Sequence, residues 1–264
     1  MKMRATIFLT KKPDASPDQN QRRGERGNVL IYILLAIALL AGLSFAVANS
    51  SRNSGGQISQ ERMNMAVNEI LEISNNIAAA VTQLTLRGCS HNQISFQNPV
   101  VAGYANPTAP VDNSCDVYHI NGGGLTYQAP QTIWFDPAIS TATANYGEII
   151  FTANTCINQV GTGTTACDTA GASAADLIMA IPYLHNDICI ELNRRLSVGA
   201  AGAAPPQDDG AAWDSTNLRF TGAYNGGAIL RDTDGVLDGK RSGCFEADTT
   251  PVTGFHYFRV LIAR

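Results

Sequence analysis

The pattern of hydrophobic and polar positions divides the chain into four parts, and its most apolar part comes early. Residues 28–51 contain no charged residue, and twelve of residues 29–48 are Val, Leu, Ile or Phe. About 20 apolar residues in a helix match the thickness of the apolar core of a bilayer. A helix also satisfies its own backbone hydrogen bonds in lipid. This pattern predicts a single transmembrane helix over residues 28–51.

A second helical pattern occupies residues 52–88. From Ser59 onward apolar residues return at the spacing of a helix, so that they lie on one face. The stripe consists of Met63, Val67, Ile70, Ser74, Ile77, Val81 and Leu84. Gly88 is a natural stop. We expect an amphipathic helix that continues the transmembrane helix.

Residues 89–264 have the character of an exported globular domain. Short runs rich in β-branched and aromatic residues predict β-strands. These runs are residues 125–128, 132–135, 148–152, 218–221 and 255–262. One helix interrupts them, with an N-cap at Asn186-Asp187 and an end at Gly199. The expected fold class is α+β: a long N-terminal helix packed on an antiparallel β-sheet, with one extra helix and disulfide bracing.

Charge is distributed unevenly along the chain. Residues 1–27 contain seven basic and three acidic residues, whereas the rest of the chain contains 11 basic and 19 acidic residues. Basic flanks of a transmembrane helix stay in the cytoplasm. We therefore expect a cytoplasmic basic leader over residues 1–27 and export of the C-terminal domain. The acidic character of the exported part argues against direct binding of nucleic acid.

The junction between leader and apolar helix carries a resemblance. Arg22-Arg23-Gly24-Glu25-Arg26-Gly27 is followed by Asn28-Val29-Leu30-Ile31-Tyr32. This sequence resembles the processing site of a type IV prepilin or pseudopilin, and the resemblance covers residues 22–86. It implies that a prepilin peptidase cleaves after Gly27 and that Asn28 becomes the methylated N-terminus. It also implies that the apolar helix packs against other pilin or pseudopilin subunits in a type IV pilus or type II secretion-like filament.

Two positions depart from the pattern of this family. Asn28 stands where the family has an aromatic residue or Met, and Tyr32 stands at the helix core position where the family has Glu. In the family that Glu compensates the N-terminal ammonium of a neighbouring subunit in the apolar filament core. Some minor pseudopilins, notably the K-type component at the tip of secretion pseudopili, also lack it. The resemblance therefore implies a minor or tip subunit.

The resemblance also implies a location. The protein is expected in the inner membrane as a single-pass protein, with its N-terminus in the cytoplasm and its C-terminal domain in the periplasm or on an extracellular filament. Two other interpretations use the same segment. A secretory signal peptide would be cut after Ala46-Val47-Ala48, and a simple anchor would never be cut. Either would leave a periplasmic binding or adhesin domain that does not assemble.

Six cysteines lie beyond the apolar segment, and they add a compartment to this picture. They are Cys89, Cys115, Cys156, Cys167, Cys189 and Cys244. An even number of cysteines in an exported domain indicates disulfides in an oxidising compartment. The sequence does not choose among the pairings, and we favour the sequential one: Cys89–Cys115, Cys156–Cys167 and Cys189–Cys244. No C-x-x-C motif is present and the four histidines are scattered, which argues against a zinc site.

One group of carboxylates suggests a ligand. Asp232, Asp234 and Asp238 surround a Gly turn and resemble part of a calcium-binding loop, because Ca²⁺ prefers carboxylate oxygens on a tight turn. A solvated turn with Asp at favoured turn positions is the alternative. No nucleophile elbow, Walker loop or H-E-x-x-H motif occurs in the chain. We therefore expect a structural protein rather than an enzyme, with Ca²⁺ as the one candidate cofactor.

Overall fold

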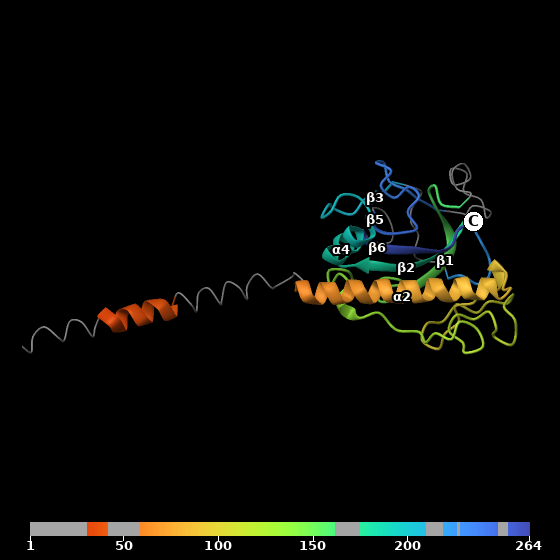
Figure 1. Ribbon diagram of the computed structural model, residues 1–264, viewed down its shortest axis with the longest axis horizontal. Helices are drawn as coiled ribbons and strands as arrows, with labels where there is room; N and C mark the ends of the chain where they lie inside the picture. The colour runs from red at the N-terminus through yellow and green to blue at the C-terminus, as the bar shows by residue number, and fades with distance from the viewer. Residues whose placement is uncertain (1–30, 42–58, 162–174, 210–218, 226–227, 248–252) are drawn as a thin grey trace, which may run out of the picture. The chain divides into compact units, whose positions relative to one another are not determined.

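The computed structural model of the chain contains two units, Met1–Gln57 and Ile58–Arg264 (Figure 1). It describes residues 31–41, 59–161, 175–209, 219–225, 228–247 and 253–264. Residues 31–41 of the first unit are helical. Among its described residues, the second unit contains two α-helices, one sheet and a long loop-rich segment.

The structure contradicts the expected location. No helix within the described ranges combines the length and the apolar character that crossing a membrane requires. The prediction of a single-pass inner-membrane protein is therefore wrong on this finding.

The helix α2, Gln60–Leu86, has the predicted buried stripe. All seven positions expected on that stripe are buried, from Met63 to Leu84. Ser74, the polar member of the stripe, accepts a hydrogen bond of 3.0 Å from the Tyr257 hydroxyl and donates one of 3.0 Å to the Leu71 carbonyl. A polar residue is thus tolerated inside this stripe because both of its hydrogen-bonding roles are satisfied.

Six strands form one sheet in the order β3-β5-β6-β2-β1-β4. The strands are β1 Ile150–Ile157, β2 Asp176–Leu184, β3 Gln207–Asp208, β4 Ala228–Leu230, β5 Ser242–Ala247 and β6 Gly254–Ile262. The four central strands pair in antiparallel fashion. The two edge strands differ, since β4 runs parallel to β1 and β3 runs parallel to β5.

The predicted fold class is therefore wrong in two respects. The sheet is mixed rather than antiparallel, and no long apolar helix is present in the part of the chain that the structure describes. The edge strands β3 and β4 have only two and three residues. Such short strands carry too few positions for an alternating pattern, so the sequence indicates neither their existence nor their direction.

The strand β2 organises two hydrophobic clusters, because all nine of its residues are buried. Leu177, Met179 and Ile181 belong to the cluster that includes the buried face of α2. Ile178 and Ala180 belong to a second cluster with residues of β5 and β6. The sheet is thus covered on both faces, which accounts for the continuous apolar run in this strand.

Residues 89–149 form a long segment in which little of the predicted β structure occurs (Figure 1). The run at residues 125–128 is not a strand, and the run at 132–135 contains the 3-10 helix η2, Thr132–Trp134. A second 3-10 helix, η1, spans His91–Gln93. Aromatic packing holds this segment to the sheet: the rings of Phe96 and Phe151 stack with their centres 4.0 Å apart.

Of the three remaining expected strands, two overlap observed strands and one does not. Residues 148–152 overlap β1, and residues 255–262 lie within β6. Of the run at 218–221, residues 219–221 are not in a strand and Leu218 lies outside the described residues.

The extra helix, α4, spans Asn186–Leu196. Its N-cap is His185, whose side chain accepts a hydrogen bond from the Asp187 amide, rather than the expected Asn186. The helix ends at Ser197, which adopts the left-handed conformation with φ of 55°, two residues before the expected Gly199. A non-glycine residue with this conformation terminated the helix earlier than the glycine signal indicated.

Candidate functional site

The helix at residues 31–41 presents apolar side chains to its surroundings. Eight large hydrophobic side chains of this helix are between 51 and 67 % exposed. They include Tyr32, the predicted helix core position, at 64 %. Residues 31–35 are consecutive and all exposed, and five residues complete more than one turn, so the apolar surface surrounds the helix. A surface of this kind needs a covering partner.

The predicted processing site adjoins this helix. Gly27 and Asn28 lie outside the described residues, as does most of the leader's junction with the helix. The processing step therefore stays a prediction from the sequence.

Two of the predicted disulfides are confirmed. Cys89 pairs with Cys115, and Cys189 pairs with Cys244. Cys156 is also disulfide-bonded, while Cys167 lies outside the described residues.

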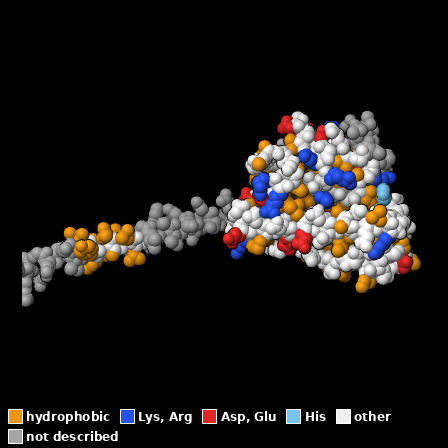
Figure 2. Space-filling model, in the orientation of Figure 1, with side chains coloured by type: hydrophobic (Ala, Val, Ile, Leu, Met, Phe, Trp, Pro, Cys, Tyr) orange, Lys and Arg blue, Asp and Glu red, His pale blue; other side chains and the backbone are white. Residues whose placement is uncertain are grey.

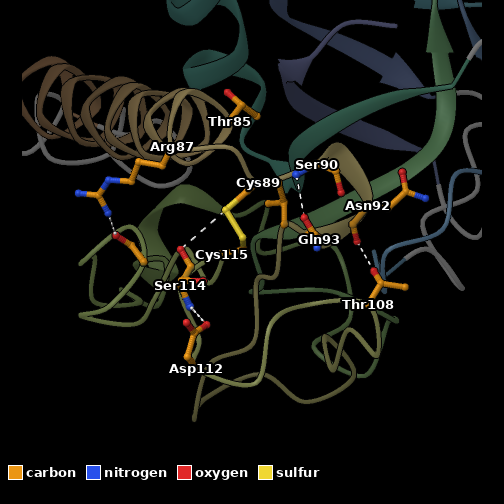
Figure 3. The surroundings of a disulfide bond; sticks show 12 residues. Thr85, Arg87, Cys89, Ser90, Asn92, Gln93, Thr108, Asp112, Ser114 and Cys115 are labelled. Carbon is orange, nitrogen blue, oxygen red and sulfur yellow. Dashed lines mark hydrogen bonds between the residues drawn. A yellow bond between two sulfur atoms is a disulfide. The ribbon is translucent and has the colours of Figure 1, made fainter.

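The Cys89–Cys115 bridge fixes the start of the loop-rich segment to its own interior (Figure 3). On one side of the bridge Arg87 donates a hydrogen bond of 2.9 Å to the Gly122 carbonyl. On the other side the Ser114 amide donates to the Asp112 carboxylate at 3.0 Å. The bridge and these hydrogen bonds hold residues 112–122 at the end of α2, so the segment has a defined position despite its lack of strands.

The predicted calcium loop is organised around its own backbone. Asp232 is buried, and its two carboxylate oxygens accept hydrogen bonds from the Val236 amide at 2.9 Å and the Leu237 amide at 2.7 Å. Asp238 accepts from the side-chain amides of Asn158 at 2.7 Å and Gln159 at 2.8 Å.

These hydrogen bonds place Asp232 and Asp238 in structural roles. Asp234 is exposed on the same turn. Across the residues that the structure describes, no group of three or more His, Cys, Asp or Glu side chains could hold a metal ion. The calcium site at Asp232, Asp234 and Asp238 stays a prediction, and the described geometry matches the alternative turn more closely.

An acidic residue that the sequence did not single out supports the contact between the two helices. Glu191, in α4, accepts hydrogen bonds from Arg194 at 2.6 Å and 2.7 Å and from Arg195 at 2.8 Å. Arg195 in turn donates to Asn64 at 2.8 Å and to Asn68, both in α2. Arg195 therefore connects α4 to α2, and the Glu191 carboxylate holds its guanidinium in place.

Replacing Glu191 with Gln should flatten the dependence of stability on pH in acid. Hydrogen bonds from Arg194 and also from Arg195 lower the pKa of Glu191 to about 2, against 4.5 for an ordinary Glu. A lowered pKa means that the stabilisation is present above pH 4.5 and is lost as the pH falls towards 2. Thermal unfolding between pH 2 and pH 5 measures this slope. An identical slope in the parent and in Glu191→Gln would contradict the assignment.

A second polar residue that the sequence did not reveal connects α4 to the sheet. Asn193 is 4 % exposed; its side-chain amide donates to the Cys244 carbonyl and its oxygen accepts from the Cys244 amide, both at 2.8 Å. The side chain thus hydrogen-bonds to β5 as a neighbouring strand would, and it does so at Cys244, a residue of the disulfide that joins the same two elements. Its signal in sequence is only an Asn within a helical pattern, which does not identify an inward-facing amide.

Similarity to other proteins does not extend these observations. No protein-family model matches the chain, and neither the curated proteins nor the solved structures with which it was compared contain a match.

Proposed function

We propose that this chain is a pilin-like structural subunit, a minor pilin or pseudopilin of a type IV pilus or type II secretion-like filament. A prepilin peptidase removes the leader after Gly27, and the mature chain assembles with other pilin or pseudopilin subunits through its apolar helix. The observation that carries the proposal is the exposure of eight large apolar side chains on residues 31–41. Packing this helix against the apolar helices of other subunits removes that apolar surface from water.

The second unit, Ile58–Arg264, supports the proposal as a module for display. It has its own hydrophobic clusters and is braced by disulfides, so it does not depend on the apolar helix for a core. Tyr32 supports a minor position in the filament. A filament built of many copies would bury each N-terminal ammonium without the carboxylate that the family places there, which is costly in an apolar core.

A lysine in the apolar helix tests assembly. Leu35 is 59 % exposed, and Leu35→Lys would place an unpaired charge among packed helices, at a cost of several kcal/mol by desolvation. We expect the fraction of the chain recovered in sheared, sedimented filaments to fall at least about ten-fold, since about 1.4 kcal/mol already corresponds to a factor of ten.

Met65→Lys is the matched control. Met65 is 62 % exposed on α2, in the other unit. Met65→Lys therefore replaces an exposed apolar side chain with lysine, as Leu35→Lys does. Incorporation of Met65→Lys should equal that of the parent. Equal incorporation of Leu35→Lys and Met65→Lys would contradict assembly through the apolar helix and favour the alternative, a binding or adhesin domain that does not assemble.

A further inference from the structure

A cavity of about 550 Å³ lies between one face of α2 and the segment of residues 118–128. The volume is in the range of small-molecule binding sites. The lining from α2 includes Glu69, Glu72 and Ile73, which lie on one side of the helix because Glu72 and Ile73 follow Glu69 by three and four residues. The facing wall includes Tyr118 and Leu125. This face of α2 adjoins the buried stripe, whose Ile77 also lines the cavity.

Two contacts hold the cavity open by fixing its ends. At one end Gln131 donates a hydrogen bond of 2.6 Å to the Glu69 carboxylate. At the other end Gly123 lies close to the helix, since an added Cβ would lie 3.2 Å from the Ala80 Cβ. The segment is thus pinned to α2 at both ends, and the space between the pins is preformed.

The charge in the cavity is negative and uncompensated by the described residues. Glu69 has the neutral Gln131 amide as its polar partner. No ion pair between described residues includes Glu69 or Glu72. In Figure 2 acidic side chains lie over α2, whereas most Lys and Arg side chains on this face lie over other elements. The cavity therefore attracts a cation.

The remaining lining is suited to an alkyl chain and to an aromatic contact. Ile73 and Leu125 are partly buried and supply aliphatic surface. The Tyr118 ring is held in place by Tyr127 and Phe151, with ring centres 5.5 Å and 6.1 Å away. A fixed aromatic ring and two carboxylates in the lining of one cavity favour an ammonium or guanidinium group, which interacts with the ring face as well as with the anions.

We propose that this cavity binds a small organic cation, an ammonium or guanidinium group on a short alkyl stem. The charged group lies with Glu69 and Glu72, and the stem lies against Ile73, Leu125 and the ring of Tyr118. The site is independent of filament assembly, since every residue in it belongs to the unit Ile58–Arg264.

Titration calorimetry of the full chain with n-butylguanidinium tests the site. We expect a dissociation constant of about 0.1–1 mM, because partly solvated ion pairs contribute modestly. The uncharged isostere n-butylurea should bind at least about ten-fold more weakly. Each of Glu69→Gln and Glu72→Gln should weaken butylguanidinium binding about three-fold, and the double variant about ten-fold.

Glu61→Gln is the control, since Glu61 is exposed in the first turn of α2 and does not line the cavity. It should bind butylguanidinium like the parent. Equal binding of butylguanidinium and butylurea, or unchanged binding in the double variant, would overturn the proposal.

A second experiment distinguishes a free organic cation from the basic side chain of another protein. A short peptide with one central arginine is compared with butylguanidinium. Tighter binding of the peptide identifies a basic protein side chain as the occupant, and tighter binding of the free cation identifies a small molecule. Binding of neither would overturn the proposal.

Discussion

Replacing both Cys189 and Cys244 with alanine should lower the free energy of unfolding by about 4 kcal/mol. The bridge spans a separation of 55 residues, and the loss of loop-closure entropy in the unfolded chain rises with loop length. Both cysteines are fully buried, and they join α4 to β5 at the point where Asn193 makes its two hydrogen bonds to Cys244. Denaturant unfolding, followed by circular dichroism, measures the difference.

The matched control is the pair Cys89→Ala and Cys115→Ala. That bridge closes a separation of 26 residues, so chain entropy assigns it a smaller effect, about 3.5 kcal/mol. It also lies at the end of α2 rather than between α4 and β5. A loss of less than about 1 kcal/mol on removal of Cys189–Cys244, or a larger loss for the control pair, would contradict the expectation that Cys189–Cys244 is the more stabilising of the two bridges.

Replacing Asp176 with asparagine should remove a dependence of stability on pH that has the opposite sign to that of Glu191. Burial raises the pKa of Asp176 to about 6, although the Ile157 and Arg264 amides donate to it, each at 3.0 Å. A raised pKa means that the folded state holds this proton more tightly than the unfolded state. The contribution is therefore present below about pH 4 and is lost as the pH rises through 6, by up to about 3 kcal/mol.

Urea unfolding at pH 4.5 and at pH 7 measures this effect. In Asp176→Asn we expect lower stability than the parent at pH 4.5, because one backbone amide faces an NH₂ group in place of an acceptor, which costs about 1–3 kcal/mol. The difference should shrink at pH 7, where the parent carries a buried charge. A difference that grows between pH 4.5 and pH 7 would contradict the assignment.

The helices α2 and α4 were the part of the fold that could be predicted from the sequence. The stripe from Met63 to Leu84 repeats at helical spacing for six turns, and each position on it is buried in α2. The second helix was located within two residues at its start, because its apolar period and polar flanks agree. Its end was less certain, since Ser197 rather than Gly199 takes the left-handed conformation.

The sheet could be predicted only in part, and β2 shows why. Residues 177–181 are all apolar because both faces of the strand are buried, so they show no alternation. Pro182 in the same strand also counts against strand structure. The edge strands β3 and β4 are too short to have a pattern at all. A mixed sheet was therefore expected to be antiparallel.

The candidate sites show the same limit. The sequential cysteine pairing was confirmed for two bridges, Cys89–Cys115 and Cys189–Cys244. The cavity beside Glu69 and Glu72 was not predicted, since it depends on how closely Gly123 approaches Ala80 across 43 positions of sequence. Contacts of that kind have no local signal in the chain.

The N-terminal residue of the mature protein tests the proposed processing most directly. The protein is isolated from cells that possess a prepilin peptidase, and its N-terminal peptide is identified by mass spectrometry. The proposed function predicts a chain that begins at a methylated Asn28. A chain that retains Met1, or one that begins at Asn49, would contradict it.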